Sequence, residues 1–444
     1  MELFVGNIYS TLVTTEKKLI NALRKKYSVK VPGYSYTPQY RSGRWDGTKY
    51  YISNKGKFRT GLLQHILEDL DTLELKYTIK YVDKNNEELS DYTIDSIELR
   101  PYQECIIEAA LDLKRCIVQA PTGSGKTFIM ASILKAMGDR PGIIMFNQKQ
   151  ILVQTYEIFK KLGFDVGIAF GEGVDIKPVT LCTVQSIDKV MPTHLKTAEF
   201  IMVDEVHEFS KGELTTAAIG SFPKAAFRYG FTATVPSDRM AKLNLVSRIG
   251  QITRETSVKE LVSEGYLASY NIRIVDTPGD VESGDESLSY MESYDKYIIN
   301  NKERNNKIAE LVEKIREEDR YSRILILVKN LSHASTLHKL IEGSFKLEGK
   351  DSMEDRNAVI KKFKDTDKSV LIGTKILQTG VDIPHITDLI NARGLRSEIA
   401  TIQALGRGLR LHQSKDHLNI IDFMDKAPYL EKHSKSRIKI YNKL

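Results

Sequence analysis

The chain has 444 residues, of which 41% are hydrophobic and 28% are charged, and its formal net charge at pH 7 is +7. This length favours about three domains, and no apolar run approaches the ~20 residues of a membrane-spanning helix. The N-terminus lacks the basic-then-apolar pattern of a secretory signal. We therefore expect a cytoplasmic protein without a membrane partner.

Three cysteines, Cys105, Cys116 and Cys182, are scattered along the chain in apolar surroundings. An odd number of scattered cysteines argues against a disulfide framework, and none has the spacing of a zinc site. Their contexts predict reduced thiols in hydrophobic cores.

The N-terminal domain, which we place at residues 1–95, begins with the most basic part of the chain. Residues 1–60 contain twelve Lys and Arg against three Asp and Glu, and aromatic side chains are interspersed with them. Basic side chains contact phosphates and exposed aromatics stack on bases, so the pattern predicts a nucleic-acid-binding domain with Arg41, Arg44 and Trp45 among its contacts. The alternative is a small domain whose aromatics form its core and whose charges are solvated.

A glycine-rich segment lies between a predicted strand, 116–119, and a predicted helix, 128–137. Its sequence is Ala120-Pro121-Thr122-Gly123-Ser124-Gly125-Lys126-Thr127, with Ala where the usual pattern begins with Gly. In this context free backbone N–H groups and the helix dipole favour a bound phosphate. Lys126 would reach the β- and γ-phosphates and the Thr127 hydroxyl would ligate magnesium. The alternative, a surface turn, does not explain the strand and helix on either side.

An acidic pair follows the apolar run Phe200-Ile201-Met202-Val203, which predicts a parallel strand covered on both faces. Asp204 and Glu205 come at its carboxyl end, where open α/β sheets bind ligands. Asp204 would hold magnesium, and Glu205 would orient and deprotonate the attacking water. His207, the fourth residue of this acidic string, is a further candidate catalytic residue. Alone, such a pair is more often a solvated helix start, but the phosphate loop reverses that preference.

The order of the remaining motifs is more specific. They are Arg100-Pro101-Tyr102-Gln103, Thr183-Val184-Gln185-Ser186, Thr232-Ala233-Thr234, Gly373-Thr374-Lys375, Gly380-Val381-Asp382 and Gln403-Ala404-Leu405-Gly406-Arg407-Gly408-Leu409-Arg410. This ordered series resembles superfamily 2 helicases over about residues 98–425.

The resemblance implies roles for several of these residues. Gln103 would recognise adenine, and Thr232 and Thr234 would link the ATP site to the nucleic-acid track. Arg407 and Arg410 would be arginine fingers, a role suited to planar and always charged guanidinium groups, although an Arg pair is otherwise often a solvated face. The resemblance also places Gln403 among the catalytic residues, and Gly380 and Asp382 among the nucleotide-binding ones. Candidate nucleic-acid contacts of the motor are Gln148, Thr183, Gln185, Ser186, Thr374 and Lys375.

Apolar strands alternate with helix-length segments in two groups, which argues for two parallel α/β sheets. The strands are predicted at 116–119, 143–146, 179–183, 200–203 and 227–231, and then at 323–328, 369–373, 388–391 and 418–423. The expected architecture is α/β, with two RecA-like lobes in tandem, at residues 96–265 and 266–444, behind a small N-terminal α+β DNA-binding domain. The stretch 276–294, rich in Gly, Ser, Asp and Glu, is predicted to be a loop early in the second lobe.

The string Arg44-Trp45-Asp46-Gly47, followed by a predicted strand, and the compact motor together resemble the UvsW family of bacteriophage recombination and branch-migration helicases. The resemblance implies an ATP- and Mg²⁺-dependent DNA helicase or translocase, monomeric, that remodels branched or forked DNA without reading sequence. If the chain is phage-encoded, it would act in the bacterial host cytoplasm. A double-stranded DNA translocase without strand separation and an RNA helicase remain alternatives, and an ATP-gated nucleic-acid clamp is a less favoured one.

Overall fold

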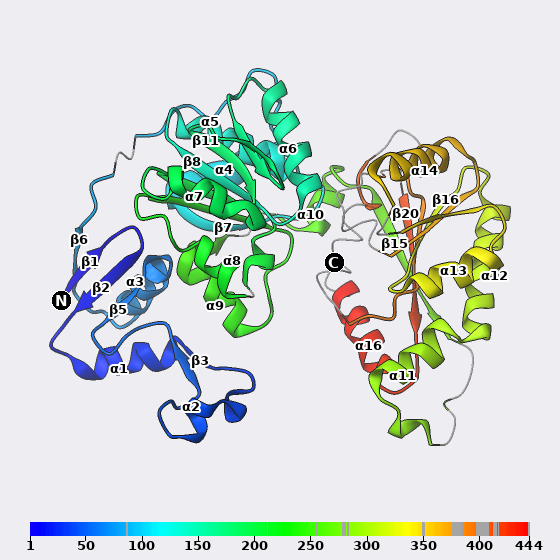
Figure 1. Ribbon diagram of the computed structural model, residues 1–444, viewed down its shortest axis with the longest axis horizontal. Helices are drawn as coiled ribbons and strands as arrows, with labels where there is room; N and C mark the ends of the chain where they lie inside the picture. Colours follow the sequence, from blue (N-terminus) through cyan, green and yellow to red (C-terminus); the bar gives the residue numbers. More distant parts are fainter. Residues whose placement is uncertain are drawn as a thin grey trace. The chain divides into compact units, whose positions relative to one another are not determined.

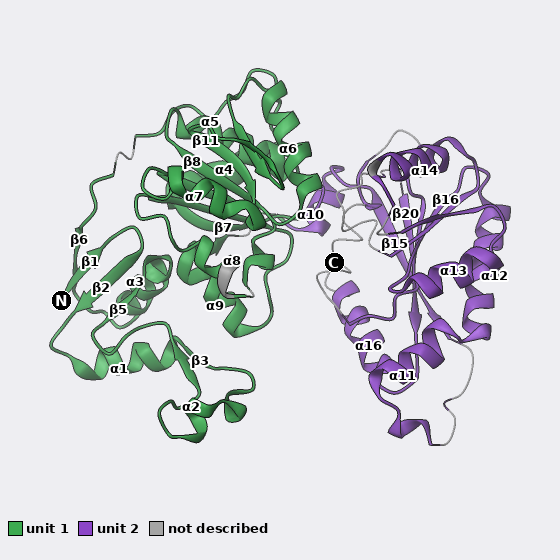
Figure 2. Ribbon diagram, in the orientation of Figure 1, with its two compact units in different colours: residues 1–121, 125–256 green, residues 122–124, 257–444 purple. Residues whose placement is uncertain are grey.

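The structure is a computed structural model, in which the chain forms two compact units (Figure 2). Unit 1 holds residues 1–121 and 125–256, and unit 2 holds residues 122–124 and 257–444. The structure describes residues 1–444 apart from 86–87, 211, 254–255, 278–280, 282–283, 349–350, 375–382, 384, 397–407, 412–414, 416 and 443–444. Within this described part, no helix combines the length and the apolar character that a bilayer span requires.

The N-terminal domain is a small sheet covered by two helices (Figure 1). The strands are β1 (Glu2–Val5), β2 (Tyr9–Val13), β5 (Lys57–Arg59) and β6 (Thr78–Tyr81), in the order β5-β2-β1-β6. The helices α1 (Lys17–Lys26) and α3 (Leu63–Thr72) bury apolar residues at helical spacing, such as Ile66 and Leu70 of α3. A separate hairpin joins β3 (Ser28–Lys30) to β4 (Thr48–Tyr50), and its connection carries η1 (Tyr34–Tyr36) and α2 (Pro38–Arg41).

The rest of unit 1 is the first RecA-like lobe. Its strands are β7 (Arg115–Gln119), β8 (Gly142–Phe146), β9 (Gly167–Phe170), β10 (Gly173–Asp175), β11 (Val179–Thr183), β12 (Phe200–Val203), β13 (Phe227–Thr232) and β14 (Gln251–Thr253). They form one sheet in the order β10-β9-β11-β8-β12-β13-β7-β14, in which only the β10–β9 pair is antiparallel. All five strands predicted for this lobe are confirmed.

Helices separate the strands of the first lobe, as parallel pairing requires, except along β9, β10 and β11, which follow one another directly. The helices are α4 (Pro101–Leu113), α5 (Lys126–Met137), α6 (Lys149–Lys161), α7 (Ile187–His194), α8 (Glu213–Ala218) and α9 (Arg239–Arg248), with the 3₁₀ turns η3 (Val184–Ser186) and η4 (Val206–Ser210). The 3₁₀ turn η2 (Thr60–Leu62) belongs to the N-terminal domain and precedes α3. Cys116 on β7 and Cys182 on β11 are buried as predicted. The prediction for Cys105 was wrong, because the buried face of α4 is formed by Tyr102, Ile106 and their helical neighbours, and Cys105 lies exposed on the other face.

The second lobe, in unit 2, is a parallel sheet in the order β15-β20-β19-β16-β18-β17. Its strands are β15 (Ser269–Asp276), β16 (Arg323–Leu327), β17 (Ser344–Leu347), β18 (Ser369–Gly373), β19 (Asp388–Asn391) and β20 (His417–Met424), and its helices are α10 (Val258–Ser263), α11 (Tyr290–Tyr294), α12 (Lys302–Glu318), α13 (Leu331–Leu340), α14 (Met353–Asp365) and α16 (Leu430–Tyr441). The four strands predicted here are confirmed.

The predicted loop at 276–294 was wrong in part. The described residues of this stretch include a 3₁₀ turn, η5 (Asp285–Ser287), and the whole of α11. A capping box starts this helix, since Ser289 Oγ accepts from Glu292 N at 3.3 Å and Ser289 N donates to Glu292 Oε2 at 2.8 Å. Polar residues of this stretch, which had indicated a loop, therefore include the capping residues of a helix.

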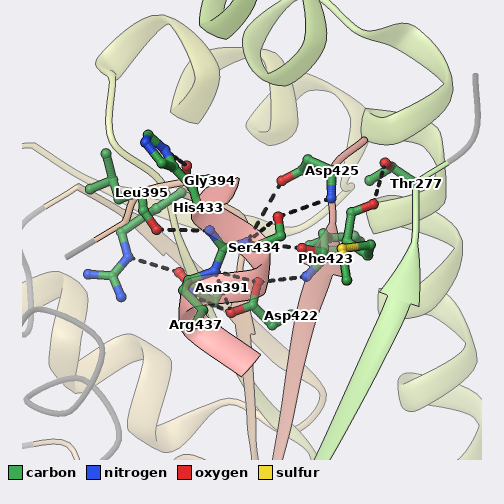
Figure 3. Close-up of polar contacts among 12 residues, drawn as sticks. Thr277, Asn391, Gly394, Leu395, Asp422, Phe423, Asp425, His433, Ser434 and Arg437 are labelled. Carbon is green, nitrogen blue, oxygen red and sulfur yellow. Dashed lines mark hydrogen bonds and ion pairs between the residues drawn. The ribbon is translucent and has the colours of Figure 1, made fainter. Parts of the chain in front are cut away.

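A buried polar cluster fixes the last helix to the second sheet (Figure 3). Arg437 of α16 points toward Asp422 on β20, with its Nε 2.9 Å from Asp422 Oδ2, and it also donates to the carbonyls of Leu395 and Phe423. Removing one partner of such a buried ion pair costs about 3–5 kcal/mol. The contact holds α16 against the carboxyl ends of β19 and β20.

Candidate active site

Three motifs that are distant in sequence lie close together at the carboxyl ends of three neighbouring strands of the first sheet. The phosphate loop follows β7, the acidic pair follows β12, and Thr232 ends β13, which lies between those two strands. Ala120 N donates to Thr232 O at 3.0 Å, and Asp204 N donates to Met145 O at 2.9 Å. Because the strands are parallel, all three motifs lie at their carboxyl ends, where open α/β sheets bind ligands.

The phosphate loop is shaped by two glycines in the left-handed region, Gly123 with φ 90° and Gly125 with φ 77°. The N-cap of α5, which begins at Lys126, is Gly125, which has no side chain to cap the helix. The N-terminal N–H groups of such a helix favour a bound anion. Lys126 Nζ donates to Ala120 O at 3.2 Å and to Pro121 O at 3.4 Å. Thr122 and Ser124, on either side of Gly123, complete the predicted loop. Thr127 lies half-buried in the first turn of α5.

Gln103 lies against this loop from the first turn of α4. Its side chain is buried, and its Oε1 accepts from Arg100 N at 2.9 Å. A Cβ atom on Gly125 would lie 2.3 Å from Gln103 Nε2, so this side chain lies directly against the loop, at a position whose φ of 77° favours glycine. The structure thus brings Gln103 and the phosphate loop together, while its role toward adenine stays a prediction.

The acidic pair places two neighbouring carboxylates in largely buried surroundings, where a bound cation would stabilise their negative charge. Burial, together with the neighbouring charge of Glu205, raises the pKa of the Asp204 carboxyl to about 7, although the Lys126 ammonium acts in the opposite direction. Carboxylate and hydroxyl oxygens, as on Asp204 and Thr127, are the ligands that Mg²⁺ prefers. The residues present therefore fit a magnesium ion. Glu205 has a φ of 46°, an uncommon value for a residue with a side chain, which indicates a constrained backbone at this position.

His207 connects the acidic pair to Thr232. Its Nδ1 lies 3.2 Å from Glu205 Oε2 and 2.8 Å from Thr232 Oγ1, and its Nε2 lies 3.1 Å from Glu208 Oε1. Burial lowers the pKa of His207, but the hydrogen bonds to Glu205 and Glu208 outweigh burial and raise it to about 9. Thr232 Oγ1 in turn donates to Thr234 O at 2.8 Å. Sequence reasoning missed Glu208, for which adjacency to His207 was the only signal.

The candidate nucleic-acid contacts of unit 1 differ in their exposure. Gln148 and Gln185 follow the adjacent strands β8 and β11, and Gln185 is exposed, whereas Thr183 and Ser186 are buried and hydrogen bonded to each other at 3.2 Å.

In the β3–β4 connection of the N-terminal domain, Arg41 and Arg44 are exposed. Trp45 is half-buried, and its Nε1 donates to Thr48 O at 2.9 Å. Arg41 Nε donates to Ser35 O at 3.4 Å, and the exposed guanidinium ends of both arginines can contact a ligand, while the indole N–H is used within the domain.

Several predicted residues of the second lobe lie outside the described residues. These are Lys375, Gly380, Asp382, Gln403 and Arg407. Thr374, directly after β18, and Arg410 are described, and both are half-buried.

Three family models match the chain in the predicted order. "DNA helicase UvsW, N-terminal" matches residues 6–81, "Type III restriction enzyme, res subunit" matches residues 96–237, and "Helicase conserved C-terminal domain" matches residues 304–412.

Curated relatives and solved structures agree with these matches. The chain is 23% identical to the ATP-dependent DNA helicase uvsW of Enterobacteria phage T4, over 96% of this chain and 91% of that protein. It is 25% identical to the DNA 3'-5' translocase XPB2 of Sulfurisphaera tokodaii, over 71% of this chain and 79% of that protein. A fragment of an HsdR subunit of a type I restriction enzyme from Vibrio vulnificus shares the fold, with a TM-score of 0.60 and 21% identity over 77% of this chain and 67% of that one. With the N-terminal domain and both lobes accounted for, the chain is a UvsW-like superfamily 2 helicase.

Proposed function

We propose that this chain is an ATP-dependent DNA helicase that remodels branched DNA, by branch migration, fork reversal or the processing of D-loops and Holliday junctions, in recombination, repair or replication. The observation that carries the proposal is the meeting of the phosphate loop, the acidic pair and Thr232 on three neighbouring strands, in a chain that also matches the UvsW N-terminal domain. The domains we propose are residues 1–95, 96–265 and 266–444. We also propose that the protein acts as a monomer in the host cytoplasm.

In the proposed reaction, the residues of the first lobe hold the nucleotide and prepare the water. Gln103 contacts the base, and Lys126 contacts the β- and γ-phosphates. Asp204 and Thr127 would hold Mg²⁺, which supplies positive charge against the phosphate oxygens. Glu205 orients the attacking water and accepts its proton.

From the resemblance, we propose that the second lobe completes the reaction. Arg407 and Arg410 would stabilise the charge that develops on the γ-phosphoryl, with Gln403 beside them in the motif. Gly380 and Asp382 would belong to the nucleotide-binding residues.

The proposed DNA contacts involve mainly the backbone. Those of the motor are Gln148, Thr183, Gln185, Ser186, Thr374 and Lys375, and those of the N-terminal domain are Arg41, Arg44 and Trp45. Contacts to phosphate position the DNA without reading its sequence. We therefore expect binding that depends on DNA structure and that weakens steeply with salt.

The test of this function is the ATPase rate with single-stranded DNA, duplex DNA, a four-way junction and RNA side by side. We expect the junction to stimulate most and to be resolved into its arms. Strongest stimulation by RNA would contradict the proposal. Stimulation by duplex without any strand displacement or junction resolution would instead favour a double-stranded DNA translocase.

Replacing Arg41 and Arg44 together by alanine is expected to weaken junction binding by about 10-fold and to reduce the slope of log affinity against log salt by about 2, since two phosphate contacts are lost. Both side chains are exposed, so the fold should not change. Fluorescence anisotropy at several salt concentrations measures the effect.

The matched control replaces Lys17 and Lys18, two exposed charges on α1 of the same domain. An equal loss in this control would mean that overall charge, and not the β3–β4 connection, holds the junction.

A further inference from the structure

One buried amide joins the N-terminal domain to the first lobe. Asn244 of α9 is 6% exposed, and its Oδ1 accepts hydrogen bonds from Lys49 Nζ and from the Tyr51 hydroxyl, both at 2.7 Å. Its Nδ2 donates to Ser210 O at 3.3 Å. Lys49 lies on β4 and Tyr51 directly after it, so both partners belong to the hairpin whose connection carries the exposed basic residues. The amide is therefore hydrogen bonded to both domains at once.

Ser210 continues this contact toward the acidic pair. It ends η4, the turn that contains His207, and its Oγ donates to His207 O at 2.6 Å. The His207 ring then contacts Glu205 and Thr232. Hydrogen bonds thus connect Tyr51, Asn244, Ser210 and His207. The His207 ring in turn forms an ion pair, at 3.2 Å, with Glu205, the carboxylate that we assign to water activation.

The surrounding packing makes this contact rigid. A Cβ atom on Gly61 of the N-terminal domain would lie 2.1 Å from Val246 O, so the backbones of η2 and α9 touch directly. Apolar residues of both domains, such as Leu62 and Ile249, belong to one continuous core. Tight packing transmits a displacement instead of absorbing it. A shift of the hairpin must therefore move Asn244 or leave buried polar groups without partners, which is costly.

We propose that Asn244 is a positioning residue that couples DNA binding by the N-terminal domain to the placement of Glu205. This inference rests on the proposed function, because it takes Glu205 as the water-activating group and DNA as the ligand of the N-terminal domain. Asn244 itself contacts neither.

Two conservative variants test the coupling from its two sides. Tyr51→Phe removes one donor from the N-terminal side, and Asn244→Asp keeps the acceptor but removes the donor to Ser210. The matched control is Tyr27→Phe, because the hydrogen bonds that the structure describes for the Tyr27 hydroxyl stay within the N-terminal domain, to Asp69 Oδ2 at 2.9 Å and to His65 O at 3.2 Å. The full-length proteins are compared by kcat and KM for ATP, with and without a saturating four-way junction, and by urea unfolding.

We expect Tyr51→Phe and Asn244→Asp to lower the junction-stimulated kcat by about 2- to 30-fold, the range of such coupling effects, while the DNA-free rate and the KM for ATP change by less than about twofold. Tyr27→Phe should keep full stimulation. Equal losses with and without DNA, or the same loss in Tyr27→Phe, would mean a purely structural role and would overturn the coupling. Normal stimulation in both test variants would overturn it as well.

The wild-type chain separates this proposal from the proposed function. If no DNA stimulates the wild type, the proposed function fails, and the coupling fails with it. If the wild type is stimulated and the variants respond equally well, the coupling alone fails.

Discussion

Replacing Lys126 by alanine is expected to lower the DNA-stimulated ATPase rate by about 10²–10³-fold, which is typical for the loss of a group that stabilises developing charge. Its ammonium is the cation of the phosphate loop, and in the described part of the chain it donates to the carbonyls of Ala120 and Pro121. The fold should therefore tolerate the change. Junction binding should stay within about twofold of wild type, since binding depends on phosphate contacts made elsewhere.

Steady-state ATPase assays and junction anisotropy measure both quantities on the same preparation. The matched control is Lys135→Ala, which removes an exposed lysine from the same helix, α5, and should leave the rate within about twofold. Normal turnover in Lys126→Ala would refute the phosphate-loop assignment. A parallel loss of junction affinity would show instead that the substitution had disturbed the first lobe.

The strands of both lobes could be predicted because central strands of a parallel sheet are covered on both faces and show as continuous apolar runs. Val203 ends such a run on β12, and Gly373 ends another on β18, where every residue is buried. The edge strand β15 escaped prediction because it is mostly exposed, with a single buried residue, Val275. The strand β10 escaped because all three of its residues are exposed.

Some residues of the candidate site could likewise be predicted from the sequence, and others could not. The phosphate loop and the acidic pair are each contiguous in the sequence, so their chemistry can be predicted from the sequence. Asn244 and Ser210 could not be predicted, because they are distant in sequence and neither belongs to a motif. Only the packing of α9 against η4 and β4 brings their polar groups together. A site formed by one segment produces a recognisable sequence motif, whereas a contact between residues of two domains produces none.

Replacing Glu205 by glutamine is expected to lower the hydrolysis rate by about 10²–10⁴-fold, the usual contribution of a general base, while ATP still binds. Glutamine has nearly the same shape but cannot accept a proton from water. Single-turnover hydrolysis and equilibrium binding of a fluorescent ATP analogue separate the two effects. Loss of nucleotide binding together with hydrolysis would contradict the assignment.

Glu208→Gln is the control that tells water activation from an effect through His207. Both Glu205 and Glu208 hydrogen bond the His207 ring and raise its pKa, so either substitution should lower that pKa. Only Glu205 follows Asp204 at the carboxyl end of β12. If Glu205 activates water, Glu208→Gln should keep the rate within about fivefold of wild type while Glu205→Gln loses it, because a general base contributes at least ~10². Equal losses in the two variants would assign the effect to the charge of His207.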